Sequence, residues 1–311
     1  MNFGRVGVLA GGPSSEREIS LRSGKAVYNA LIREGVNVFF VDVRDNIYDI
    51  IKSEKMDVAF LALHGKFGED GTIQKILDTE GIRYTGSGAR ASELALDKIA
   101  SKEAFIKNGI PTPGYSIVDK DCFPDPDRTC SLHALSESGN LKFPLVVKPQ
   151  FEGSSIGLSV VKGKEALKSA LDKAFEYGPK ALLEEYVSGR ELTVGILNDE
   201  PLPVIEIVPR QHLYDYKAKY SDPDTQYLVP APISGRATEL ARSLGLRSHT
   251  ALGCRSFSRT DMMMDSSGSI FVLEVNTIPG MTERSLLPKA AAAIGVNFGE
   301  LCVKLIEDAI R

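Results

Sequence analysis

Residues 256–276 read SFSRTDMMMDSSGSIFVLEVN and contain two adjacent β-forming runs, 256–264 and 269–275. Side chains in a strand repeat every second residue, so Arg259 and Asp261 share one face, as do Glu274 and Asn276. The pattern predicts three oxygen ligands, Asp261, Glu274 and Asn276, on one sheet face. Such a set suits Mg²⁺, which keeps its other positions for water and substrate phosphates. This favours an ATP-dependent enzyme, although two amphipathic strands with polar outer faces would give the same pattern.

The length of 311 residues exceeds what one ordinary hydrophobic core supports and predicts two or three domains of about 100 to 150 residues each. The net charge is −4, so no basic excess marks a surface for nucleic acid or anionic membrane. We therefore expect neither as a partner. An anionic ligand has to be held by a local group of residues.

The four cysteines, Cys122, Cys130, Cys254 and Cys302, are scattered and form no C-x-x-C motif. Their spacing predicts free thiols in a reducing compartment. The amino terminus has neither a basic leader nor a long hydrophobic region, and no apolar run reaches about 18 residues. These features predict a cytoplasmic protein that does not span a membrane.

The first 90 residues alternate between apolar strand patterns and helical patterns, which predicts a parallel α/β arrangement. Ligands of such sheets bind outside the carboxyl ends of the strands. The loops at 11–16 and 64–71 each follow a predicted strand, so we expect them at one edge. The predicted elements are strands at 5–10, 36–43 and 58–63 and a helix at 15–34.

Beyond residue 90 the pattern changes to helix up to about Asn108, then to a small α+β unit from Phe143 to about Val187. The remainder supplies more strands, the pair described above and two closing helices. The predicted domains are 1–90, 91–187 and 188–311. We assign no function to the segment 119–140.

A lysine and a glycine loop lie close together in the middle of the chain. Lys148 ends the predicted buried strand 145–149, and the loop 152–157 (EGSSIG) follows. Glycines allow backbone N–H groups to approach a phosphate, and such a loop can cover a nucleotide. The Walker motif is absent. A plain hairpin is the alternative interpretation, and the preceding lysine favours phosphate binding.

The run 182–187 (LLEEYV), followed by Glu191, reads as a strand leading into a linker. Backbone groups of a linker can recognise an adenine edge, and a carboxylate can accept hydrogen bonds from both ribose hydroxyls. An exposed acidic strand edge is the alternative.

Two residues of the amino-terminal loops carry chemistry of their own. Glu16 lies in the opening turn of a helix, where its charge would repel a pyrophosphate but could bind an ammonium group. A carboxylate that complements the helix dipole is the alternative. His64 lies in a glycine-bounded loop at the same edge, where a structural role is equally compatible. The missing G-x-G-x-x-G disfavours a nicotinamide-dependent oxidoreductase.

The polar loop 210–230 contains YDYKAKY at 214–220 and is long for a connection, which is typical of a lid. Lys219 could contact a phosphate, and Tyr220 could close a substrate pocket. A solvated hairpin tip is the alternative.

Taken in order, these elements resemble the D-alanine:D-alanine ligases of the ATP-grasp superfamily over nearly the whole chain. No single motif is decisive, but seven in sequence order are specific. They are GGPSSEREIS at 11–20, LHGKFGEDG at 63–71, YTGSG at 84–88, Lys148-Pro149 with EGSS at 152–155, YDY at 214–216 with Lys219-Tyr220, Arg259 with Asp261, and EVNTIPGMT at 274–282.

The resemblance implies a three-domain ATP-grasp architecture, with an N-terminal parallel α/β domain and an α+β ATP-grasp portion. ATP would lie between the central and carboxy-terminal domains, and two Mg²⁺ or Mn²⁺ ions would be held by Asp261, Glu274 and Asn276. The residues implied in nucleotide binding are Lys98, Lys148, Glu184, Glu185, Val187, Glu191 and Lys219.

For the substrates, the resemblance implies that Glu16 binds the ammonium of the first D-alanine with support from Ser154 and Tyr220. Arg259 and the backbone of Gly280 would face an oxyanion. Ser285 would bind the carboxylate of the second D-alanine, with His64 and Leu286 as further substrate-site residues.

The activity implied is ATP-dependent ligation of two D-alanine molecules through an acylphosphate, for peptidoglycan precursor synthesis, by a homodimer. Related ligases accept D-lactate instead, and a tyrosine at position 220 favours the amine acceptor. Another ATP-grasp carboxylate–amine or carboxylate–thiol ligase would keep the nucleotide site without Glu16, Tyr220 and Ser285. A nucleotide-binding regulator without catalysis would not require Arg259 beside the metal ligands.

Overall fold

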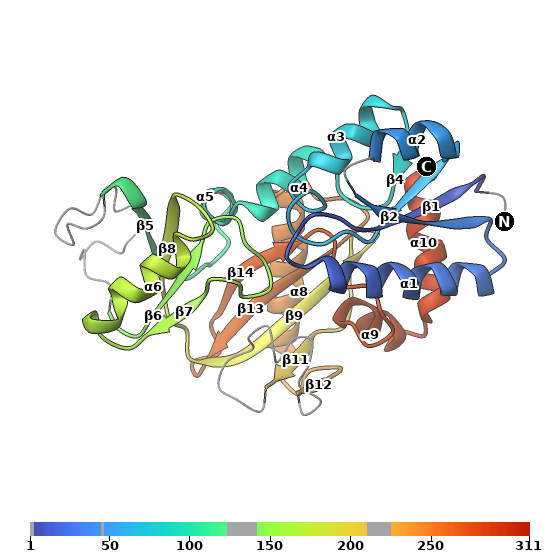
Figure 1. Cartoon of the computed structure of the whole chain (residues 1–311). Coiled ribbons are helices and arrows are strands. Elements are labelled where there is room, and N and C mark those ends of the chain that lie inside the picture. The colour runs from blue at the N-terminus through green and yellow to red at the C-terminus, as the bar shows by residue number, and fades with distance from the viewer. Residues whose placement is uncertain (1–2, 45–46, 123–141, 210–224) are drawn as a thin grey trace.

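The computed structural model describes residues 3–44, 47–122, 142–209 and 225–311, and these form three sheets with helices packed on them (Figure 1). The predicted lid residues Lys219 and Tyr220 lie outside the described residues, as does most of the segment 119–140. Within the described residues, no helix combines the length and apolar character needed to cross a membrane.

The amino-terminal sheet is parallel throughout, in the order β2-β1-β3-β4, which confirms the prediction. Every residue of β1 is buried, because helices cover both faces of the sheet and a buried parallel strand must be apolar on both sides. The elements are β1 (Val6–Gly11), α1 (Arg17–Arg33), β2 (Val38–Val43), α2 (Ile47–Glu54), β3 (Val58–Leu61), α3 (Thr72–Thr79) and β4 (Arg83–Tyr84).

The last helix of the chain, α10 (Phe298–Ile310), packs with α1 against this first sheet (Figure 1). Asn297 caps its start in a reciprocal capping box with Glu300. Leu301 and Leu305 are fully buried in the same cluster as Val8 of β1. The core of the first 90 residues therefore includes side chains from the carboxyl end of the chain. The helix α9 (Leu286–Ala292) precedes α10 in the sequence.

The carboxy-terminal sheet is antiparallel, in the order β12-β11-β9-β13-β14, with β10 paired to β9. Its apolar face is covered by α8, and by α4 and α5 from the segment before the small sheet. The elements are α4 (Ala89–Leu96), α5 (Lys98–Lys107), β9 (Gly189–Leu197), β10 (Glu200–Pro201), β11 (Ile205–Val208), β12 (Gln226–Leu228), α8 (Gly235–Ala251), β13 (Phe257–Asp265) and β14 (Ile270–Asn276).

The prediction of a loop over residues 210–230 is wrong in its last part, because residues 226–228 form β12. This short strand pairs with β11 through Tyr227 opposite Ile207. A three-residue edge strand carries too few residues for a period to be recognised in the sequence.

The central sheet, β5-β8-β6-β7, is a small antiparallel unit with one helix on it. The glycine loop joins β6 to β7 as predicted, and Lys148 lies one residue before the end of β6. The elements are β5 (Tyr115–Asp119), η1 (Lys120–Cys122), β6 (Leu145–Pro149), β7 (Ser159–Val161), η2 (Lys164–Ala166), α6 (Leu167–Ala174) and β8 (Lys180–Glu185).

Cys254 and Cys302 are free and buried, in agreement with the predicted thiols. Burial raises the pKa of Cys254 to about 11, so its thiol stays protonated at neutral pH.

The packing of α10 on the first sheet predicts a large effect of truncating its buried face. Leu305→Ala is expected to lower the free energy of unfolding by about 2–5 kcal/mol, because the lost side chain is fully buried and leaves a cavity. Urea denaturation measures the change. Lys304→Ala, on the exposed side of the same helix, serves as the control, and equal losses in the two variants would contradict the packing.

Candidate active site

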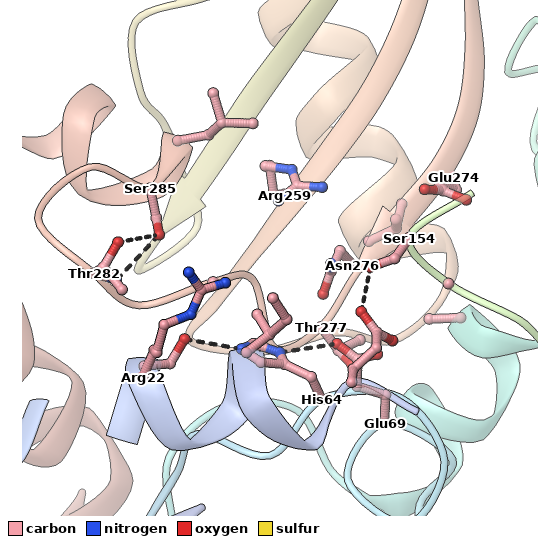
Figure 2. Close-up of a pocket in the computed structure, with 18 of the residues that line it drawn as sticks. Arg22, His64, Glu69, Ser154, Arg259, Glu274, Asn276, Thr277, Thr282 and Ser285 are labelled. Carbon is pink, nitrogen blue, oxygen red and sulfur yellow. Dashed lines mark hydrogen bonds and ion pairs between the residues drawn. The ribbon is translucent and has the colours of Figure 1, made fainter. Parts of the chain in front are cut away.

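One cavity of about 570 Å³ lies among α1, the loop after β3, the glycine loop after β6, strands β13 and β14, and the segment after β14 (Figure 2). It brings together ten residues that were predicted from sequence as site residues. They are Glu16, His64, Lys98, Ser154, Arg259, Glu274, Asn276, Gly280, Ser285 and Leu286.

The pairing of β13 with β14 sets the geometry of one wall. Asp261 lies opposite Glu274, and Arg259 lies opposite Asn276. Directly opposed residues of an antiparallel pair point to the same face, so the predicted shared face is confirmed. The register shifts just after Asp261, where a bulge interrupts the ladder.

Arg259 is held in place by a two-pronged ion pair within its own strand. Its Nε and Nη2 donate to the two carboxylate oxygens of Asp261 at 2.8 and 2.7 Å. The hydroxyl of Thr193 on β9 also donates to Asp261, at 2.7 Å. Because both partners are almost fully buried, this pair is screened little by solvent and orients the guanidinium beside the cavity (Figure 2).

The predicted metal ligands provide an all-oxygen donor set. Among the described residues, no group of three or more His, Cys, Asp or Glu side chains has the arrangement of a metal site. The predicted set differs from such a group, because it contains two carboxylates and one amide. Asn276 Oδ1 accepts the Ile278 N–H at 3.1 Å, which orients the amide. A carboxylate or amide oxygen can accept a second partner, so the set fits a hard cation such as Mg²⁺ or Mn²⁺.

The opposite wall joins the amino-terminal loop to the glycine loop. Ser154 Oγ donates to Glu16 Oε1, although the two residues lie 138 positions apart. Ser154 has a φ of 49°, a left-handed conformation that turns its hydroxyl toward the carboxylate. Gly65 also has positive φ, which glycine adopts without strain, and a Cβ there would lie 2.9 Å from Glu16 Oε2.

His64 is buried, and both of its ring nitrogens face protein side chains (Figure 2). Nε2 lies 3.1 Å from the hydroxyl of Ser23 on α1. Nδ1 lies 3.8 Å from Glu69 Oε1. Sequence reasoning had identified neither Ser23 nor Glu69 as a site residue.

Ser285 and its neighbours form the other end of the cavity. The N–H of Thr282 donates to Ser285 Oγ at 3.1 Å, and the two hydroxyls are 2.9 Å apart. A Cβ at position 280 would lie 3.2 Å from the same Ser285 oxygen, so the backbone approaches closely there. Three cations missed by sequence reasoning also line the cavity: Arg22, Arg284 and Lys289.

A group of buried lysines lies beside the cavity. Lys148 Nζ is 2.8 Å and Lys102 Nζ is 3.1 Å from the same oxygen of Glu184, and Lys98 donates to the backbone oxygen of Glu152. Burial lowers the pKa of Lys98, and that of Lys102 to about 8. Burial alone would raise the pKa of Glu184, but Lys102 and Lys148 hold it below its usual range.

Lys102 was missed by sequence reasoning. The available signal was its position one helical turn after Lys98, with Asp97 capping the start of α5. Lysines four residues apart lie on the same face of a helix. If Lys98 contacts a buried phosphate, Lys102 is therefore expected close to the same site.

Three further predicted nucleotide ligands, Glu185, Val187 and Glu191, lie on the path from β8 to β9 and do not line the cavity. Glu185 is exposed, while Val187 and Glu191 are half-buried. The backbone N–H of Glu185 donates to Gly114 at 2.9 Å, which places this path beside the connector before β5.

Replacing Lys102 tests how much the pairing of the buried charges contributes to the stability of the protein. Lys102→Met is expected to lower the free energy of unfolding by about 1–3 kcal/mol, since Glu184 keeps Lys148 but loses one charged partner. Urea denaturation measures the loss, with Lys107→Met on the exposed side of the same helix as the control.

Adding Glu184→Gln to Lys102→Met is expected to increase the loss, because the buried Lys148 then loses the carboxylate that pairs with it. A Lys102→Met variant as stable as Lys107→Met would show that the ion pair of Lys102 with Glu184 does not stabilise the protein.

Comparison with known proteins identifies two family models. The model described as "D-ala D-ala ligase C-terminus" matches residues 105–307, and the one described as "D-ala D-ala ligase N-terminus" matches residues 44–87. The D-alanine–D-alanine ligase of Pelotomaculum thermopropionicum is 45% identical over 311 residues, covering 99% of this chain and 97% of that protein. The corresponding protein of Syntrophotalea carbinolica is 43% identical over 308 residues, covering 98% and 96%.

Among solved structures, the D-alanine–D-alanine ligase from Bacillus anthracis complexed with ATP has a TM-score of 0.83 and 34% identity. A second crystal structure of the same protein has a TM-score of 0.85 and 36% identity. Each match covers 99% of this chain and 97% of the other.

Proposed function

The chain belongs to the D-alanine–D-alanine ligase family, and we propose that it joins two D-alanine molecules to D-alanyl-D-alanine with conversion of ATP to ADP and phosphate. The dipeptide is a precursor for peptidoglycan. One observation carries the proposal: a single cavity holds a buried carboxylate, Glu16, on one wall and the guanidinium of Arg259 on another. A site that binds a zwitterionic amino acid needs a negative group near the ammonium and a positive group near the carboxylate.

The nucleotide is proposed to bind between the central and carboxy-terminal sheets. Lys98 and Lys148 would contact its phosphates, because Lys98 lines the cavity and both ammonium groups are buried, where solvent screens their attraction to an anion little. The base and ribose would contact Glu184, Glu185, Val187 and Glu191, and Lys219 the γ-phosphate. The ATP complex of the Bacillus anthracis relative supports this ligand class.

Asp261, Glu274 and Asn276 are proposed to hold two Mg²⁺ or Mn²⁺ ions. When bound, such ions offset the charge on the phosphoryl oxygens of the nucleotide. Asp261 already accepts from Arg259 and Thr193, so its carboxylate is oriented before any ion binds.

The chemistry begins with a carboxylate, which is a poor electrophile. An oxygen of the first D-alanine carboxylate attacks the γ-phosphorus of ATP, ADP leaves, and an acylphosphate forms. The amine of the second D-alanine then attacks the carbonyl carbon, loses a proton, and phosphate leaves. Glu16, with Ser154 and Tyr220, would hold the first ammonium, and Ser285 the second carboxylate, beside His64 and Leu286.

The tetrahedral intermediate carries an oxyanion that Arg259 and the backbone N–H of Gly280 are proposed to stabilise. A preorganised donor in a water-poor site lowers the barrier because it needs little reorganisation during the reaction. The loop with Lys219 and Tyr220 would exclude water that could hydrolyse the acylphosphate.

The domain organisation is proposed as 1–90, 91–187 and 188–311. The distribution of the strands supports these ranges, because each of the three sheets is built from strands of one range. We also propose a cytoplasmic homodimer, on the basis of the family resemblance.

The activity is tested by phosphate release and by a mass spectrum of the product. With ATP and Mg²⁺, D-alanine is expected to stimulate release and to yield the dipeptide, whereas L-alanine is not, in keeping with the D-alanine–D-alanine ligases that the chain resembles. Equal stimulation by both enantiomers would rule out the stereospecific ligase. A depsipeptide formed in the presence of D-lactate at neutral pH would indicate the alternative acceptor.

Arg259→Ala is expected to reduce turnover by about 10²–10³-fold, the typical loss when one oxyanion donor is removed. Arg236→Ala, on the exposed start of α8, removes the same charge outside the cavity and is the matched control. Urea denaturation verifies that both variants fold. Turnover in Arg259→Ala within threefold of the control would contradict the assigned role.

A further inference from the structure

Three segments that are distant in the sequence meet at the hydroxyl of Ser23. The N–H of Met281, after β14, donates to Ser23 Oγ at 3.3 Å across 258 positions. His64 Nε2, in the loop after β3, lies 3.1 Å from the same oxygen (Figure 2). Ser23 is 1% exposed, Met281 is fully buried and His64 is 5% exposed, so water does not compete at this contact.

The direction of each hydrogen bond follows from the groups around the ring. Nδ1 of His64 faces a carboxylate oxygen of Glu69, and the other Glu69 oxygen accepts the Gly65 N–H at 2.9 Å. A carboxylate attracts an N–H and does not donate, so even at 3.8 Å it favours the tautomer of the neutral ring that carries the proton on Nδ1. Nε2 is then an acceptor and requires a donor.

Ser23 supplies that donor. Its oxygen accepts the Met281 N–H, which leaves its own proton available to His64 Nε2. One hydroxyl thereby pairs with two buried polar groups, each of which would otherwise lose a hydrogen bond on burial.

We propose that Ser23 is a positioning residue of the active site, which fixes the Nδ1–H tautomer of His64 and holds the backbone at Met281. Met281 lies between Gly280, which lines the cavity, and Thr282, whose N–H binds Ser285. Holding Met281 therefore fixes the position of two groups together. They are the backbone N–H of Gly280, the proposed oxyanion donor, and Ser285, the proposed ligand of the second D-alanine. His64 acts through this network and does not present a free ring nitrogen to the substrate.

The catalytic consequence rests on the proposed function, whereas the tautomer of His64 does not. A small displacement of the Gly280 N–H lowers the rate of the chemical step, because the donor no longer meets the oxyanion at the right place. The groups that bind the nucleotide lie on other elements and are affected little. The expected signature is a fall in kcat with little change in KM for ATP.

Ser20 offers a matched control on the same helix face, one turn earlier. It is fully buried, accepts the Gly11 N–H at 2.8 Å and donates to Ala62 O at 2.7 Å. Its hydroxyl thus pairs with two backbone groups of the amino-terminal sheet and contacts neither His64 nor Met281. Ser20→Ala and Ser23→Ala remove the same atom and differ in what it connects.

The experiment compares these two variants in the full-length protein. Ser23→Ala is expected to lower kcat about tenfold or more, and Ser20→Ala less than threefold, with unfolding midpoints measured for both. Ring ¹⁵N NMR, with the His64 signal assigned by its loss in His64→Gln, is expected to show the Nδ1–H tautomer in the wild type. In Ser23→Ala the signal should shift toward a mixture of tautomers.

A wild-type His64 protonated on Nε2 would overturn the proposal, and this readout stands even if Ser23→Ala fails to fold or D-alanine is not turned over. A kcat of Ser23→Ala no lower than that of Ser20→Ala would overturn it as well. Absence of turnover in the wild type, with the expected tautomer, would instead count against the proposed function alone.

Discussion

The antiparallel pairing of β13 with β14 is the constraint on which the rest of the site depends. It places Arg259 and Asp261 opposite Asn276 and Glu274 on one face, and the bulge after Asp261 ends that alignment. A slip of one residue would turn all of these side chains to the other face, where Val194, Met262 and their neighbours form a core. The apolar pattern of the strands therefore enforces the position of the polar groups.

The charged groups around the cavity are costly to bury unless each is paired or faces a ligand. Asp261 with Arg259, and Glu184 with Lys102 and Lys148, satisfy this requirement within the protein. Burial lowers the pKa of Lys98 and of Lys102, while the carboxylates of Glu184 and Glu274 oppose that shift. An anionic ligand such as a nucleotide phosphate would favour the charged form of both lysines.

The cavity is also the place where the three sheets are joined. Ser154 of the glycine loop reaches Glu16 of the amino-terminal loop, and Ser23 reaches the segment after β14. The helix α10 adds a larger apolar contact between the two ends of the chain. The groups proposed to bind substrate come from different sheets, and these polar contacts together with the apolar packing of α10 hold them around one cavity.

The sequence by itself determined the features that depend on local periodicity and on residue type. These are the parallel strands at the amino end, the shared face of Arg259, Asp261, Glu274 and Asn276, and the glycine loop after Lys148. The ordered motifs also led to ten residues that the cavity unites. Only the tertiary structure decided that Lys102 pairs with Glu184, that Ser23 connects His64 to Met281, and that α10 completes the first core. These contacts join residues separated by as many as 258 positions, so they depend on how whole elements pack, and no local pattern of side chains encodes them.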